Sequence, residues 1–261
     1  MSRATVRSPA VAGLFYPALP DELEREVRGF LEAAATSGAP PKALILPHAG
    51  YIYSGPVAAA AYAQLRPFRD RYRRVVLLGP CHRVAVDGMA TSGADVFRTP
   101  LGDVPLDRQA RVELERHGVG VFEQTHKYEH SLEVHLPFLQ SVLGDFSIVP
   151  IVVGEAEAQL VADVLDALWG GPETLVVVSS DLSHYLDYEH ATAIDAVTCR
   201  AIESFDLSIT HDAACGATPI RGLLLAAERH GLDVRTLDMR NSGDTSGDQD
   251  FVVGYGAWVF S

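Results

Sequence analysis

Three histidines follow three apolar runs of the sequence, each at the point where a buried strand would end. His48 follows the run in "KALILPHAG", His82 follows "VVLLGPCHR", and His184 follows "LVVVSSDLSHY", which also contributes Asp181. If these strands are parallel neighbours, their carboxyl ends bring the side chains to one sheet edge, where α/β proteins bind ligands. Imidazole with carboxylate is a ligand set for zinc and non-heme iron, and two histidines with one acid favour ferrous iron.

The same pattern also has a plainer interpretation. A single histidine at a strand end usually caps a turn, forms a structural hydrogen bond or faces solvent. No H-E-x-x-H motif is present to strengthen the metal interpretation. Three equivalent positions favour a common site, but the pattern alone leaves a catalytic or metal site and a structural role both open.

A second histidine cluster lies in "THKYEHSLEVHLPF". A helix beginning near Ser131, with that residue as its N-cap, would leave His130 in the preceding loop and available to a site. We expect His135 to be half buried in a structural role. We expect Glu133 to be solvated.

Two further segments carry candidate polar groups. The acidic stretch "RNSGDTSGDQD" contains Asp244 and Asp248, and either carboxylate could reach a metal. Gly, Ser and Asp also favour a solvated turn by backbone preference alone. Tyr51 and Tyr53 could line a substrate pocket, or their rings could simply pack beside the loop that follows His48.

The elements that must position these residues alternate between strands and helices. Strands are predicted over 42–47, 72–80, 146–154, 173–181, 233–241 and 251–260, and helices over 18–38, 55–65, 106–118, 131–144, 155–170, 188–205 and 220–231. The stretch 85–105 is expected to hold a short strand and loops. This alternation of strands and helices predicts an α/β fold with a central mixed, mostly parallel sheet flanked by helices on both faces. No linker or repeat divides the chain, so we expect one domain over residues 1–261.

The composition excludes several classes of protein. The chain has 261 residues, of which 48% are hydrophobic, and a formal net charge of -13. This negative charge disfavours binding to nucleic acid or to an anionic membrane surface. Three scattered cysteines, no signal peptide and no apolar run of about 18 residues predict a soluble cytoplasmic protein.

Several of these segments resemble the Memo family. The stretches "AVAGLFYP", "LPHAGYIYSG", "LLGPCHR", "EHSLEVHLPFL", "SSDLSHY", "CGATPI" and "NSGDTSGD" occur in order between Pro9 and Trp258. The family includes protein B of the AmmeMemoRadiSam system, and it is similar in fold to class III extradiol ring-cleaving dioxygenases. Those enzymes bind ferrous iron with two histidines and one acid in a cleft at the end of an α/β sheet.

The resemblance implies roles for individual residues. His48 and His82 match the two metal-binding histidines of the fold. His184 matches a third active-site histidine, which is the acid/base in the dioxygenases and is counted with the metal site in Memo. Asp181 matches a neighbouring acid, and His130 lies in the EHS motif beside the cleft.

Asp244 stands, within one residue, where the animal Memo protein has a cysteine metal ligand. A carboxylate in place of a thiolate favours iron over copper. The expectation is therefore an Fe(II)-dependent oxidoreductase of the extradiol dioxygenase type, with zinc or copper as alternative metals, acting on a catechol-like or other bidentate small molecule. In this hypothesis His48, His82 and Asp244 hold the metal, with Asp181 as the alternative acid, and His184 transfers protons.

Two other functions remain open. The fold could serve as a non-catalytic module that binds a peptide or partner, since the animal Memo protein is described as a signalling adaptor. The same ligands could instead bind zinc and activate water for hydrolysis. The system name suggests a pathway shared with a radical-SAM enzyme, and a homodimer is expected only from how common dimers are among α/β enzymes.

Overall fold

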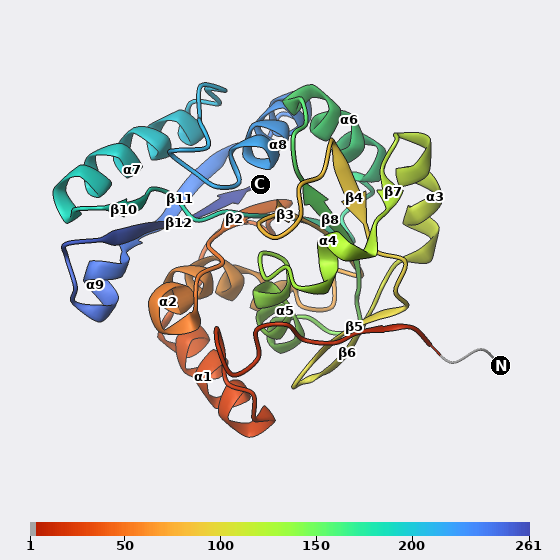
Figure 1. The fold of residues 1–261 in the computed structure, drawn as a ribbon, viewed down its shortest axis with the longest axis horizontal. Coiled ribbons are helices and arrows are strands. Elements are labelled where there is room, and N and C mark those ends of the chain that lie inside the picture. Colours follow the sequence, from red (N-terminus) through yellow and green to blue (C-terminus); the bar gives the residue numbers. More distant parts are fainter. Residues whose placement is uncertain (1–3) are drawn as a thin grey trace.

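A mixed sheet of nine strands forms the centre of the computed structural model, which describes residues 4–261 (Figure 1). The predicted domain began at residue 1, and residues 1–3 lie outside the described part. The strands are β2 (Ala43–Leu46), β3 (Arg74–Pro80), β4 (Met89–Thr91), β7 (Gly120–Val121), β8 (Ser147–Val153), β9 (Thr174–Ser179), β10 (His184–Leu186), β11 (Val234–Asn241) and β12 (Val252–Phe260). They are arranged as β10-β12-β2-β9-β3-β8-β4-β7, and β11 also pairs with β12.

The strands β2, β3 and β9 precede the three histidines, and they are adjacent and parallel, which meets the condition that the sequence set for a shared site. Leu46 lies opposite Ser179, and Leu78 lies opposite Val178, so the chain leaves all three strands at the same edge. β8 extends the parallel group beyond β3, while β12 and β4 run antiparallel to β2 and β8. The sheet is therefore mixed and largely parallel.

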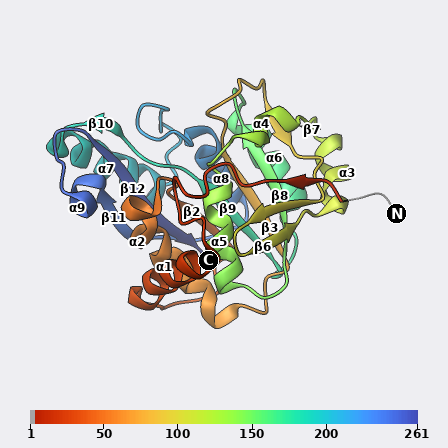
Figure 2. The same cartoon turned by 60° about the horizontal axis from the view of Figure 1, so that its bottom comes forward.

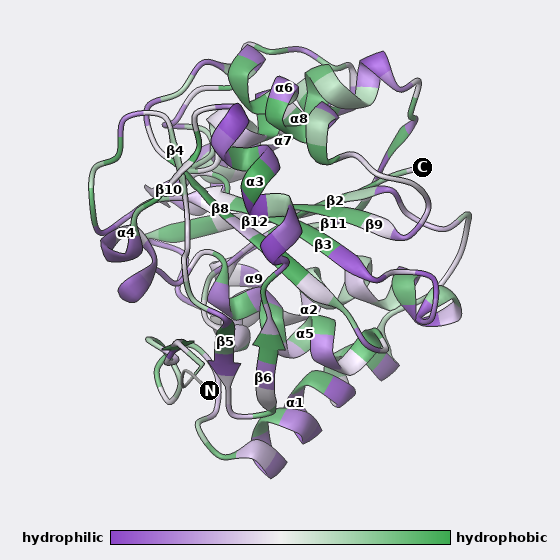
Figure 3. Ribbon diagram, turned by 90° about the vertical axis from the view of Figure 1, so that its right-hand side faces the viewer, coloured by the Kyte–Doolittle hydropathy of each residue, from purple (hydrophilic) through white to green (hydrophobic). Residues whose placement is uncertain are grey.

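Helices cover both faces of this sheet (Figure 3). One face packs against α1 (Pro20–Ala33), α2 (Tyr51–Tyr62) and α5 (Leu136–Val142), and the other against α3 (Arg108–Arg116), α6 (Ala158–Leu168), α7 (Tyr188–Glu203) and α8 (Ala217–Arg229). Alternation along β2 supplies both cores, because Leu44 and Leu46 face one side and Ala43 and Ile45 face the other. The predicted α/β class is confirmed.

A second sheet of three strands holds the N-terminal segment against the rest of the protein (Figure 2). β1 (Val6–Arg7) pairs in parallel with β5 (Val96–Thr99), which pairs antiparallel with β6 (Gly102–Pro105). Short helices elsewhere are α4 (Glu123–Lys127), α9 (Ser242–Ser246) and the 3-10 helices η1 (Ala63–Phe68) and η2 (Glu133–His135). Within residues 4–261, no helix has both the length and the apolar character that crossing a membrane requires.

Candidate functional site

Three histidine side chains from separate parts of the chain meet beyond the carboxyl edge of the sheet. His48, His82 and His130 each offer a ring nitrogen that lies within 4.8 Å of those of the other two. The ring centroids are 5.1 Å apart for His48 and His82, 5.4 Å for His48 and His130, and 4.7 Å for His82 and His130. Because metal–nitrogen bonds are about 2 Å long, this cluster could hold one metal ion.

His48 is held in one orientation by the edge of the sheet, where it is buried two residues after β2. The Ser179 hydroxyl donates to the Ser131 carbonyl at 2.6 Å, so it must accept the 2.6 Å hydrogen bond from Nδ1 of His48. Nε2 is then the unprotonated nitrogen of the neutral ring. Burial, followed by the neighbouring histidines, holds the pKa of His48 well below its usual range, so the ring is neutral at neutral pH.

The buried Glu129 carboxylate orients His82. It accepts hydrogen bonds from Nδ1 of His82 at 2.9 Å and from the His82 backbone N–H at 2.6 Å. It also accepts from the backbone N–H groups of His130 and Ser131, each at 2.9 Å. Burial opposes ionisation, yet these donors lower the pKa of Glu129 to about 2. A carboxylate only accepts, so Nδ1 of His82 carries the proton and Nε2 is left for a ligand.

His130 completes the cluster from the loop after α4, where its ring packs against Phe15 with centroids 4.8 Å apart. Its buried Nδ1 has no hydrogen-bond partner among residues 4–261. Oε1 of Glu129 lies 3.4 Å from Nδ1, a contact that is electrostatic only because it lacks hydrogen-bond geometry. Burial lowers the pKa of His130 to about 4, outweighing the opposing effect of Glu129. A neutral imidazole with an unsatisfied nitrogen is suited to binding a cation.

Asp181 and His184 lie in the same pocket, which has a volume of about 660 Å³, but outside the three-histidine group. One Asp181 oxygen accepts from the backbone N–H of His48 at 2.7 Å, and the other lies 3.8 Å from Nε2 of His48. Burial raises the pKa of Asp181 to about 7 and lowers the pKa of the partly buried His184. Both groups are therefore placed to exchange protons close to the histidine cluster.

The two tyrosines that were candidates for substrate binding take different positions. Tyr53 lines the histidine pocket. Tyr51 is the first residue of α2, which begins before the predicted start at Gly55, and its ring is buried in the core. The Tyr51 hydroxyl donates to the Val134 carbonyl at 2.6 Å, which gives this side chain a packing role.

The structure does not bring Asp244 to the histidines. One of its oxygens accepts from the backbone N–H of Asn241 at 2.9 Å in a capping box, and the other accepts from the Tyr188 hydroxyl at 2.8 Å. The side chain is exposed, and it does not line the histidine pocket. Asp244 therefore stabilises the start of α9, within the segment where the sequence indicated either a metal ligand or a solvated turn.

Glu133 is fully buried, so the expectation that it is solvated is wrong. Its carboxylate forms an ion pair with Arg7 and accepts from the Tyr16 hydroxyl at 2.6 Å. It also accepts from the backbone N–H groups of Ala10 and Val11, at 2.7 and 3.0 Å. These four groups fix the N-terminal segment to η2, just after His130, through long-range contacts that helical periodicity does not reveal.

The predicted start of the helix near Ser131, with Ser131 as its N-cap, is also wrong. Ser131 donates its hydroxyl to the Pro80 carbonyl at 2.8 Å, and the chain forms η2 before α5 begins. His135 is fully buried rather than half buried, with Nδ1 2.9 Å from the Tyr62 hydroxyl. The Ser131 bond joins this segment to the end of β3 and keeps His130 beside His82.

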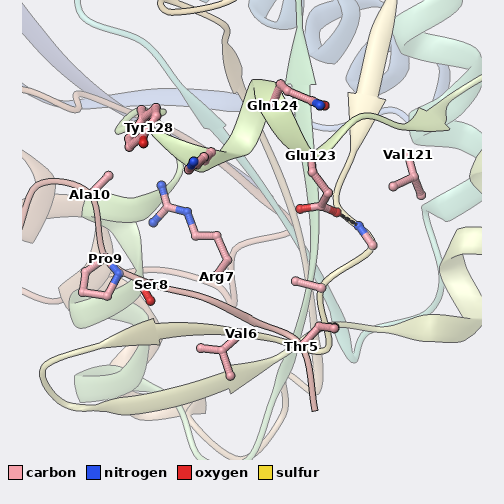
Figure 4. A pocket seen from close by; sticks show the side chains of 13 residues that line it. Thr5, Val6, Arg7, Ser8, Pro9, Ala10, Val121, Glu123, Gln124 and Tyr128 are labelled. Carbon is pink, nitrogen blue, oxygen red and sulfur yellow. Dashed lines mark hydrogen bonds between the residues drawn. The ribbon is translucent and has the colours of Figure 1, made fainter. Parts of the chain in front are cut away.

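A larger pocket of about 760 Å³ lies between the N-terminal segment and α4 and contains none of these histidines (Figure 4). Among its lining residues, Glu123 already accepts from the Gly93 backbone N–H. Arg7 donates to the carbonyls of His126 and Glu129, at 3.0 and 2.5 Å. Because these charged groups are engaged within the protein, the histidine pocket is the stronger candidate for chemistry despite its smaller size.

The fold and the site define an α/β protein with a cluster of three histidines that could hold a metal ion. The Memo-like protein family matches residues 7–259, and the chain belongs to this family. A MEMO1 family protein from Methanosarcina mazei is 38% identical over 270 residues, which cover 97% of this chain and 98% of that protein. Protein MEMO1 from Xenopus laevis is 35% identical, with 98% of this chain and 97% of that protein covered. The resemblance in sequence is confirmed.

A solved structure of low sequence identity has a similar fold. The crystal structure of the uncharacterized protein JW3007 from Escherichia coli K12 matches with a TM-score of 0.52 and 13% identity, over 83% of this chain and 98% of that chain. At this identity the likeness concerns the fold alone. The similarity to the class III dioxygenase fold stays a prediction.

Proposed function

We propose that this protein is a metal-dependent oxidoreductase of the extradiol dioxygenase type that uses ferrous iron. The observation that carries the proposal is the convergence of His48, His82 and His130, whose ring nitrogens lie within 4.8 Å of one another in a pocket. Separate segments of the chain supply these rings, and a cation would satisfy all three at once.

The donor set fits a metal for reasons that do not depend on family membership. Nδ1 of His48 and Nδ1 of His82 are engaged by Ser179 and Glu129, so Nε2 is the nitrogen of each ring that could coordinate a metal. In this structure Nε2 of His48 lies 3.4 Å from the Cys215 sulfur, a contact that a metal would replace. His130 has a buried Nδ1 with no hydrogen-bond partner in residues 4–261. We therefore assign the third ligand to His130 instead of Asp244.

The protein's own contribution to the reaction is positioning and proton transfer. A bound ferrous ion would supply the redox chemistry and would acidify the hydroxyl groups of a substrate. Asp181, whose pKa is raised to about 7 by burial, can take up a proton beside His48 and release it again near neutral pH. His184 lines the same pocket as a neutral imidazole and can accept a second proton.

Zinc-dependent hydrolysis is the second candidate function. Three histidines without a coordinating carboxylate are a known ligand set of catalytic zinc, in which a fourth position holds water. In this structure the cluster consists of imidazoles, while Asp181 lies beside it and outside the group. Asp181 would then serve as the base that takes the proton of the attacking water.

Metal analysis of protein purified without oxygen tests the proposal. We expect about one iron per chain in the wild type, and loss of the iron in a His48→Ala variant that keeps its far-ultraviolet circular dichroism spectrum. His117→Ala, on the turn after α3, is the control, and it should bind as much iron per chain as the wild type does. Zinc retained together with ester or amide cleavage would favour hydrolysis. A folded protein that binds no metal would favour the non-catalytic binding module.

A further inference from the structure

We propose that α7 carries an interface at which two copies of this chain associate as a symmetric dimer. This inference goes beyond the proposed function and does not depend on it. It is carried by an apolar groove beside α7 and by two charged side chains of that helix, Glu189 and Arg200, which a second copy would complement.

The groove has a volume of about 350 Å³ and lies between α7 and the segment 208–213. It is lined mainly by apolar residues, which include Ala193, Ile194 and Val197 of the helix and Ile209 and Ala213 of the segment. The exposed fraction is 58% for Val197 and 38% for Ile194. α7 lies at the periphery of the molecule, so this face of the helix is open to a partner (Figure 1). Exposed apolar side chains beside a groove are typical of a protein interaction surface.

Two charged residues stand at the ends of the apolar stripe. Glu189 lies one turn before Ala193, and Arg200 lies one turn after Val197, so the four residues form one row along the helix. Both charged side chains are exposed, and neither forms an ion pair or a hydrogen bond with any residue in the described range 4–261. Glu189 and Arg200 are three helical turns apart, which corresponds to about 16 Å along the axis.

This row is complementary to itself. A two-fold axis perpendicular to α7 at the level of Ile194 reverses the direction of the helix and brings Glu189 of each copy to Arg200 of the other. The same axis brings Ile194 and Val197 of the two copies together at the centre. The contact then has an apolar centre and a charged rim, which is the usual composition of a protein interface.

The charges favour a second copy of this chain as the occupant of the groove. Two copies with a formal net charge of -13 each repel one another overall. Opposite charges that face each other locally offset this repulsion and fix the orientation of the two helices. The antiparallel arrangement supplies two such pairs, one on each side of the axis, and it needs no partner of another kind.

Sedimentation velocity across the micromolar concentration range tests the interface. We expect the wild type to dimerise reversibly and Val197→Glu to be monomeric, because each copy of that variant would place a carboxylate in the apolar centre. Val112→Glu is the matched control, since Val112 has an exposed fraction of 55% but lies on α3, on the other side of the molecule (Figure 1). It should dimerise as the wild type does.

Charge reversal tests the antiparallel arrangement. Glu189→Arg or Arg200→Glu alone creates two repulsive contacts by symmetry and should raise the dissociation constant of the dimer by at least about tenfold. The double variant restores both pairs with their signs exchanged, so its dissociation constant should return close to that of the wild type. Each reversal also opposes the dipole of α7. An effect that acted through helix stability alone would therefore make the double variant the weakest dimer, which is the opposite result.

Circular dichroism establishes that each variant is folded before its association is measured. A wild type that stays monomeric throughout the micromolar range would overturn the inference and assign the groove to a different partner. Dimerisation of Val197→Glu with the affinity of Val112→Glu would overturn it as well. A double reversal that associates no more tightly than either single reversal would refute the pairing of Glu189 with Arg200.

Discussion

Replacing Glu129 by glutamine tests whether this buried carboxylate prepares His82 for a metal. The wild-type carboxylate accepts from Nδ1 and from the backbone N–H of His82, at 2.9 and 2.6 Å, and from the backbone N–H groups of His130 and Ser131. Glutamine keeps the shape of the side chain but places an NH₂ group where one oxygen stood. Two donors then face each other at one of these contacts, and the negative charge beside His82 is lost.

The size of the effect follows from these contacts. Loss of a carboxylate that orients a metal-binding histidine weakens metal affinity by about 10- to 100-fold, which corresponds to about 1.4–2.7 kcal/mol. Leaving one partly buried N–H of His82 without an acceptor costs about 1 kcal/mol of folding stability in addition, the low end of the range for a buried donor, because water can reach part of the residue. We therefore expect Glu129→Gln to remain folded, to melt at a lower temperature and to bind metal more weakly.

Competition with a chromophoric chelator, using Co²⁺ or Zn²⁺ under anaerobic conditions, measures the affinity directly. Glu123→Gln is the matched control, because Glu123 also accepts from a backbone N–H group, that of Gly93, but lies outside the histidine pocket. Unchanged metal affinity in Glu129→Gln, beside a large loss in His48→Ala, would refute the orienting role of Glu129. A loss of similar size in Glu123→Gln would show that the effect is not specific to the site.

Three further predictions concern stability, each measured by thermal or denaturant unfolding. Glu133→Gln leaves the buried Arg7 without its carboxylate and should cost about 3–5 kcal/mol, lowering the melting temperature by roughly 10 °C; a change within 2 °C would contradict the importance of this pair. Gly254→Ala should cost about 1–3 kcal/mol or more, because its Cβ would lie 1.9 Å from an Asp195 oxygen, and a neutral effect would contradict that packing. Burial lowers the pKa of His126 to about 4, so between pH 6.5 and 4 the unfolded chain takes up a proton that the folded chain does not. Stability should fall in this window by about 1.4 kcal/mol per pH unit from this group, and the fall should be shallower in His126→Gln.

Much of the fold was predictable because its determinants are local. Strands of four to seven residues, each containing a continuous apolar run, form β2, β3 and β9, which are buried on both faces, and helices between such strands favour their parallel orientation. The same runs place His48 and His82 at the sheet edge. The short elements were less predictable, since β10 depends on its pairing with the distant β12 and the five-residue α9 is too short to show a helical period.

The membership of the site was only partly predictable. His130 was one candidate among several, and its proximity to His82 depends on Ser131 bonding to Pro80 across 51 positions of the chain. Asp244 matched a family position, yet its oxygens are engaged locally by the start of α9. No residue-level signal singled out Glu129 except its place beside His130 in the EHS motif.

The sequence by itself determined the α/β class, the family and the placement of His48, His82 and His184 after strands. Only the tertiary structure decided which rings meet, which carboxylate orients them and which carboxylate is merely a cap. The physical reason is the separation of the contacting residues along the sequence. Strand and helix patterns are set by neighbouring residues, whereas His82 contacts Glu129 across 47 positions and His48 contacts Ser179 across 131 positions. Such pairs are selected by the packing of whole elements against one another, which composition and periodicity do not encode.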